Sequence, residues 1–308
     1  MSAAEAESNT LVREGKMKFM GFHTWYRILG ERTPGTFPLL ILHGGPGCGH
    51  DYLTSLDDLT QEGRQLIYYD QLGCGNSAVP EGKIHWDRRI FLEELEQLRL
   101  CLGLEEVHIL GQSWGGMLAM EYLEGQPQGV KSLIVSSSPA SMRRWQEEAW
   151  RLIEQLPEED QEAIRRCEAS GNYEDEAYDR ANELYSRLHV CSLNPYPAPV
   201  ARSLSFQAEC YRKMIGPSEF SITGNLKDWD ICEDLGKIKV PTLILSGSED
   251  EATPEMMREV QAGIAGSHLE ILPGTHLVHW EQRERYNQLV GEFLEKVERS
   301  FGDGQTNH

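Results

Sequence analysis

The sequence predicts an α/β fold: a mostly parallel sheet flanked by helices, with an inserted helical lid. Three observations lead to it. Short apolar runs alternate with helical patterns as far as Pro139, the strand pattern disappears over 140–235, and it resumes at Val240. Continuous apolar runs are typical of parallel strands covered on both faces by helices. We therefore expect a core domain over 1–139 and 236–308 and a helical cap domain over 140–235.

The first part of the core is predicted to contain six strands and two helices. Residues 19–29 form a pair of strands with a turn near Gly21, and further strands are expected over 38–42, 65–69, 107–110 and 130–135. Apolar residues at helical spacing from Phe91 to Leu102 predict a helix that Gly103 ends. A second helix is expected to run from the glycine-rich turn after 107–110 to about Glu124.

The insertion and the last part of the core follow from the same periodicity. Helical stripes run from Trp145 to Leu156 and from Tyr178 to Leu188, and the acidic residues after Pro157 predict a helix start. After the insertion we expect strands over 242–246 and 268–272, a helix opened by Pro254, and a closing helix with apolar positions over 286–297. The inserted block is expected to cover the carboxyl edge of the sheet, where such folds place their sites.

Composition excludes several classes of function. The 308 residues include 29 Lys and Arg against 49 Asp and Glu, a net charge of −20, which disfavours nucleic acid and anionic membranes as partners. No apolar run approaches the ~18 residues of a membrane span, and the acidic N-terminus does not suggest a secretory signal. Seven cysteines without a CxxC pair suggest reduced thiols and no zinc site. We expect a cytoplasmic protein that needs no metal or organic cofactor.

The strongest chemical signal is Gly111-Gln112-Ser113-Trp114-Gly115, which fits G-x-S-x-G between a predicted strand and a predicted helix. A serine on so sharp a turn needs neighbours without side chains. The following helix directs its N–H groups and positive dipole end toward developing negative charge. Ser113 is therefore the candidate nucleophile. The alternative is an ordinary glycine-rich strand-to-helix turn.

A catalytic serine needs a base and an acid, which follow it along the chain in this kind of site. His276 lies in the loop after strand 268–272, whereas its rival His279 is expected in the first turn of the last helix. We favour His276 because a loop reaches a site more readily than a packed helix face. Asp250 is the preferred acid after strand 242–246, with Glu249 and Glu251 as rivals.

A second glycine-rich loop, His43-Gly44-Gly45-Pro46-Gly47, follows strand 38–42. Glycines there allow the backbone to approach a substrate oxygen and donate an N–H. With the N–H of Trp114, this loop predicts an oxyanion hole, and His43 is expected to be structural. A phosphate cradle is disfavoured because no Lys-Ser/Thr follows the glycines.

Taken together, these motifs resemble the proline iminopeptidases, which are α/β-hydrolase serine peptidases that remove an N-terminal residue, usually proline. The resemblance runs from about Gly21 to Leu294 and rests on the two glycine motifs above and on segments 70–77, 216–230, 247–250 and 276–281. It implies the α/β-hydrolase fold, with Ser113, Asp250 and His276 as the triad and Gly45 and Trp114 as oxyanion donors. Asn76 departs from the family pattern, where an arginine is common.

The resemblance implies a serine aminopeptidase that acts on short peptides or amino-acid amides with a free N-terminus. The family also contains amidases and esterases, so the leaving group stays open. A binding protein that kept the fold is a further alternative.

A free N-terminal amine is a cation near neutral pH and needs carboxylates if it is enclosed. Glu251 follows the predicted acid directly, so it must lie near the site. The resemblance implies the same role for Glu219 in the lid. The alternative is that both are solvated surface glutamates.

Overall fold

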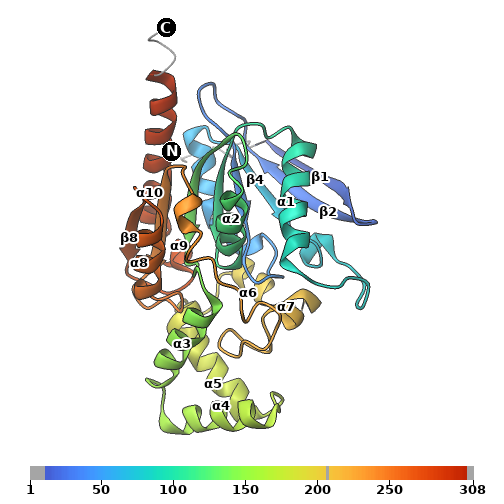
Figure 1. Cartoon of the computed structure of the whole chain (residues 1–308), viewed down its shortest axis with the longest axis vertical. Helices are drawn as coiled ribbons and strands as arrows, with labels where there is room; N and C mark the ends of the chain where they lie inside the picture. The colour runs from blue at the N-terminus through green and yellow to red at the C-terminus, as the bar shows by residue number, and fades with distance from the viewer. Residues whose placement is uncertain (1–10, 206–207, 304–308) are drawn as a thin grey trace, which may run out of the picture.

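The computed structural model describes residues 11–205 and 208–303, in which eight strands form one sheet of order β1-β2-β4-β3-β5-β6-β7-β8 (Figure 1). β1 pairs antiparallel with β2 and β2 with β4, whereas every other pair is parallel. The strands are β1 (Val12–Phe19), β2 (Phe22–Leu29), β3 (Leu39–Leu42), β4 (Leu66–Asp70), β5 (Val107–Gln112), β6 (Val130–Ser136), β7 (Thr242–Gly247) and β8 (His268–Leu272). The predicted mostly parallel sheet is confirmed.

Helices cover both faces of this sheet, as its apolar strands require. Along β3, Leu40 and Leu42 pack in one apolar cluster and Leu39 and Ile41 in the other, because successive strand side chains point to opposite faces. The first cluster includes α1 (Arg88–Leu102), α2 (Trp114–Glu124) and α8 (Pro254–Gly263). The second includes η1 (Asp51–Glu62) and α10 (Arg283–Asp303).

Two boundaries differ from prediction. β1 begins at Val12, earlier than expected, because its first residues are mostly exposed and carry no apolar pattern. A separate short helix, α9 (Val278–Glu281), ends at Gln282 before α10 begins. His279 therefore lies on α9 and not in the first turn of the last helix.

The order of the strands determines where a site can form. The chain passes from β3 to β4 on one side and then crosses to β5 on the other, so the strand order reverses at β3. Leu42 pairs with Gly111 at the ends of β3 and β5. The loops after these strands therefore emerge side by side, at the position where open α/β sheets bind ligands.

The described residues between β6 and β7 contain helices and no strand. They form α3 (Met142–Ile153), α4 (Glu158–Ser170), α5 (Glu176–Tyr185), η3 (Ser186–Val190), α6 (Ala198–Leu204), α7 (Glu209–Met214) and η4 (Leu235–Lys237). Helices α3 to α5 gather at one end of the sheet (Figure 1) and share an apolar cluster with Phe220.

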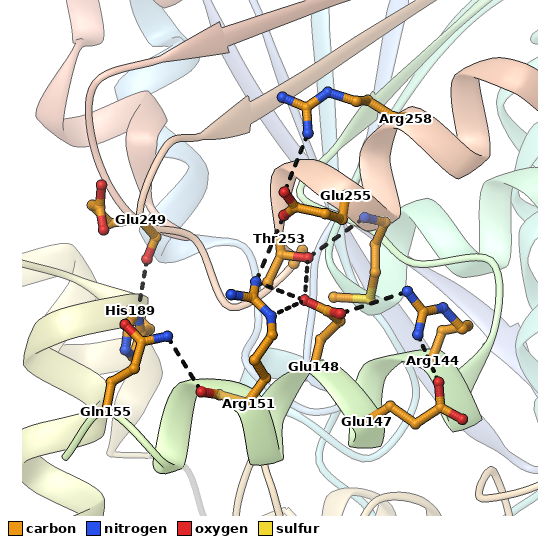
Figure 2. A network of polar contacts seen from close by, with 12 residues as sticks. Arg144, Glu147, Glu148, Arg151, Gln155, His189, Glu249, Thr253, Glu255 and Arg258 are labelled. Carbon is orange, nitrogen blue, oxygen red and sulfur yellow. Dashed lines mark hydrogen bonds and ion pairs between the residues drawn. The ribbon is translucent and has the colours of Figure 1, made fainter.

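A polar network fastens α3 to the start of α8 (Figure 2). The Glu148 carboxylate accepts hydrogen bonds from Arg151 at 2.9 Å and from the Thr253 hydroxyl at 3.0 Å. Arg151 also lies 3.6 Å from Glu255. Because Thr253 caps α8 just after the loop that carries Asp250, this network ties the inserted helices to a site loop.

Within the described residues, none of the helices combines the length and hydropathy of a membrane-spanning segment. The seven cysteines are all unpaired. The first ten residues, which bear on the prediction of no secretory signal, lie outside the described part of the chain.

Candidate active site

Ser113 occupies the turn between β5 and α2, with φ 55° and ψ −128°. This backbone conformation is uncommon for a residue with a side chain. The turn is possible because a Cβ on Gly111 would lie 2.2 Å from the Gly115 oxygen, and one on Gly115 only 2.1 Å from the Leu42 oxygen. The glycines on either side of Ser113 are thus required by close backbone contact, as the motif predicts.

A methyl group at Gly115 should therefore destabilise the fold. We expect Gly115→Ala to cost about 1–3 kcal/mol of unfolding free energy, because the Leu42 carbonyl is backbone and cannot move aside cheaply. Gly125→Ala is the matched control, since its added Cβ would meet nothing closer than 3.5 Å at the end of the same helix. Denaturant unfolding of both variants checks this, and equal midpoints would contradict it.

His276 and Asp250 come together from the loops after β8 and β7. His276 Nδ1 lies 2.7 Å from Asp250 Oδ1, and Asp250 is buried. The Asp250 carboxylate also accepts the backbone N–H of Ala252 at 2.7 Å and of Gly247 at 3.3 Å. An Nδ1–H held in this way leaves Nε2 of His276 as the basic nitrogen.

The rival residues lie elsewhere. Glu249 is exposed, and its backbone carbonyl contacts His189 Nδ1 at 3.0 Å. His279 is buried with Nδ1 2.7 Å from the Ser55 hydroxyl, and burial lowers its pKa to about 3. An imidazole so reluctant to accept a proton is a poor general base.

The glycine loop after β3 lies against the Ser113 turn. Within the described residues, the backbone N–H groups of Gly45 and Trp114 donate no hydrogen bond to a protein acceptor, and both residues line space beside Ser113. Free N–H groups in this position can receive a substrate oxygen.

Gln71, to which the sequence argument assigned no role, braces this loop. Its side chain donates to the His43 carbonyl at 2.8 Å and accepts the Trp114 indole N–H at 2.8 Å. The ring of His43 in turn accepts the Gln71 backbone N–H at 2.9 Å. Burial lowers the pKa of His43 to about 4, so this imidazole is neutral, in keeping with the structural part expected of it. Gln71 directly follows the last residue of β4, and this position at a strand end is the sequence signal that could have identified it as a site residue.

Two further carboxylates lie at the same place. Glu251 is buried, and its Oε1 lies 3.7 Å from His276 Nε2, while Oε2 has no hydrogen-bond partner among the described residues. Burial, with repulsion from Glu219 and Asp250, raises the pKa of Glu251 well above its usual value. Burial also raises the pKa of Glu219, against the opposing effects of the 2.8 Å Tyr211 hydrogen bond and of His276.

The inserted helices supply part of this site. The carbonyl of His189 at the end of η3 accepts the backbone N–H of His276 at 2.9 Å and of Glu251 at 3.3 Å. The Trp145 indole donates to the Glu219 carbonyl at 2.6 Å and packs edge-on to the His276 ring, 6.0 Å between centroids. None of these four contacts follows from the sequence pattern, because each joins residues far apart in the chain.

Ser113, His276, Glu219 and Glu251 all line one cavity of about 40 Å³, together with Gly45. The structure thus brings together the predicted serine, base, amine-binding glutamates and one predicted oxyanion donor. Asp250 contacts the far nitrogen of His276, Nδ1. Trp114 lines the neighbouring recess together with Ser113. Cys48 and Tyr52 line the same cavity and were missed.

A serine on a strand-to-helix turn, an imidazole paired with a buried aspartate and this strand order define an α/β hydrolase. In agreement, a family model described as the alpha/beta hydrolase fold matches residues 38–282. The chain belongs, more particularly, to the proline iminopeptidase family.

Membership of that family rests on relatives and solved structures matched over most of their length. The proline iminopeptidase of Lactobacillus helveticus is 43% identical over 92% of this chain and 98% of its own. That of Clostridium botulinum is 38% identical over 92% and 99%. The crystal structure of the Mycobacterium smegmatis proline iminopeptidase is 35% identical and superposes with a TM-score of 0.87, covering 94% of this chain and 99% of that one.

Proposed function

We propose that this protein is a serine aminopeptidase that releases an N-terminal residue, preferably proline, from short peptides through an acyl-enzyme. The observation that carries the proposal is the pair Glu219 and Glu251 beside His276 and Ser113. Two carboxylates in a small buried cavity are costly unless a cation joins them, and the N-terminal ammonium of a peptide is such a cation. Family membership supports the same reaction.

In the proposed mechanism, Ser113 Oγ attacks the carbonyl carbon of the N-terminal residue while His276 Nε2 takes its proton. Asp250 holds the imidazole and stabilises its charged form. The N–H groups of Gly45 and Trp114 receive the oxyanion, a contribution of about 10²–10³ in rate for one donor. His276 then protonates the leaving amine, and water releases the residue by the reverse sequence.

The terminal side chain has a defined place in this proposal. An apolar recess lies beside Ser113 and Glu219, and these apolar residues of its lining are all buried: Met117, Pro139, Met142, Trp145, Ile215 and Ile222. A pyrrolidine ring is apolar and compact, so this recess favours proline over a charged or long residue. We propose residues 140–235 as the cap domain that supplies most of these walls.

An amino-acid amidase or esterase of the same fold is the alternative. Paired assays with a proline anilide, an amino-acid amide and a simple aryl ester separate the possibilities. Fast turnover of the ester with slow anilide hydrolysis would favour the esterase. We further propose a cytoplasmic location, consistent with seven unpaired cysteines, and expect nucleic acid not to be a partner at a net charge of −20.

Neutralising either glutamate should impair recognition of the amine. We expect Glu219→Gln and Glu251→Gln each to lower kcat/KM for free-amine substrates by ~10-fold or more, about 1.4 kcal/mol of transition-state binding. N-acetylated substrates should be poor for the wild type and no poorer for either variant. Steady-state kinetics on a proline anilide and its N-acetyl form test this. Equal losses on both substrates would mean that the glutamates only hold the site together.

The burial of Glu251 should also lower the unfolding free energy of the protein when its carboxyl is ionised. A carboxyl whose pKa is raised by folding contributes most stability below its unfolded pKa of about 4.3 and loses it as pH rises through the folded pKa. Glutamine does not titrate, so Glu251→Gln should have a Tm about 2 °C or more above the wild type at pH 8. The difference should shrink toward pH 5. Thermal melts without substrate check this, and a difference independent of pH would contradict it.

A further inference from the structure

A second, larger chamber lies outside the cavity that contains Ser113. It has a volume of about 320 Å³, within the range of about 300–1,000 Å³ typical of ligand sites. Five residues line both spaces, so the two adjoin: Cys48, Val190, Ser203, Leu204 and Glu219. Its outer lining includes the exposed residues Glu183, Leu204 and Pro217, so the chamber reaches the surface.

The direction of a bound peptide follows from this arrangement. The apolar side chains that wall the recess beside Ser113 are all buried, so it can receive only the end of a chain. The residues after the scissile bond must instead run toward solvent, and the adjoining chamber reaches the surface. We infer that this chamber binds the leaving peptide and selects against a carboxylate close to the scissile bond. The inference rests on the proposed aminopeptidase function.

The selection arises from the charges that line the chamber. Among the described residues its lining contains two carboxylates, Glu183 and Glu219, and no lysine or arginine. Its other polar groups are hydroxyls and the Asn182 amide. The leaving residue of a dipeptide would bring its own carboxylate, partly stripped of water, into a space whose described lining offers it no cation, and an unpaired buried charge is unfavourable.

The penalty should decline as the peptide lengthens. Each added residue carries the terminal carboxylate up to ~3.3–3.6 Å further outward. At the mouth it would approach Arg187, which lies 3.2 Å from Glu183 and stacks over the Tyr196 ring at 5.4 Å. The preferred substrates are thus amides and peptides of three or more residues, with dipeptides as the poorest class.

The test compares Pro-Ala-NH₂, Pro-Ala, Pro-Ala-Ala and Pro-Ala-Ala-Ala by kcat/KM. We expect the dipeptide amide to exceed the free dipeptide by ~10-fold, and the tetrapeptide to come within ~2-fold of the amide. Equal values for the amide and the free dipeptide would overturn the inference while leaving the aminopeptidase function intact. Hydrolysis of none of the four would overturn both.

Variants locate the effect in the chamber. Asn182→Lys adds a cation to the chamber wall and should lower the ratio of amide to free-dipeptide kcat/KM by ~3-fold or more. Glu183→Gln, which removes a lining charge, should lower that ratio in the same direction. Ala177→Lys is the matched control, because it adds the same charge on the same helix outside the chamber lining. A ratio shifted equally by Asn182→Lys and Ala177→Lys would show a long-range field and overturn the inference.

Discussion

Replacing Ser113 with alanine is expected to lower kcat by about 10⁴-fold or more while leaving the fold intact. Alanine accepts the positive φ of 55° about as well as serine does, and the backbone N–H still bonds the Ser136 carbonyl at 2.9 Å. The loss should therefore be confined to the missing nucleophile. Turnover of a proline anilide and thermal melts of the same preparation measure the two effects separately.

Ser137→Ala is the matched control for this variant. Ser137 is also a buried serine at positive φ, 51°, and its hydroxyl has no hydrogen-bond partner among the described residues. We expect this variant to keep its activity, and labelling by a fluorophosphonate to be lost only from Ser113→Ala. Retention of a tenth of wild-type turnover in pure Ser113→Ala protein would refute the assignment of the nucleophile.

His276→Ala should be as damaging as Ser113→Ala, and combining the two should cost little more. The reason is that serine, histidine and aspartate act as one unit, so that removing the serine or the histidine loses nearly the whole contribution. The 2.7 Å contact between His276 Nδ1 and Asp250 supports this coupling. Single and double variants assayed on one anilide substrate give the comparison.

His279→Ala provides the contrast, at a histidine only three residues away. Its hydrogen bond with the Ser55 hydroxyl at 2.7 Å and its contact with the Tyr52 ring at 5.7 Å hold it in the core. We expect a lower Tm from the cavity left behind, with kcat within ~10-fold of the wild type in the folded protein. If His279→Ala lost more turnover than His276→Ala, the assignment of the base would be reversed.

Most of the fold could be predicted from the sequence because its signals are local. Buried strands such as β3 and β5 are short apolar runs, and the glycines at 111 and 115 predict the turn at Ser113. The start of β1 was not predicted, because an exposed edge strand carries no apolar pattern. The break at Gln282 that separates α9 from α10 was not predicted either.

In the site, too, some residues could be predicted from local sequence signals and others could not. Chain order and the ends of strands singled out Ser113, Asp250 and His276, because each follows a strand that the sequence reveals. The sequence analysis preferred Asp250 among the three carboxylates of 249–251, but no local pattern separates them, since neighbouring loop residues look alike. In the structure, the backbone turn directs Asp250 to His276 Nδ1 and leaves Glu249 exposed.

The sheet and the Ser113 turn follow from the sequence alone, because hydrophobic periodicity and glycine spacing act between near neighbours. The family follows from the resemblance of its motifs. The way in which the inserted helices meet the sheet is visible in the tertiary structure and not in the sequence. The tertiary structure brings Glu219 of that insertion to Glu251, places the His189 carbonyl on the His276 loop, and opens the outer chamber. These contacts join residues tens of positions apart, and packing between elements selects them. No local pattern encodes such packing.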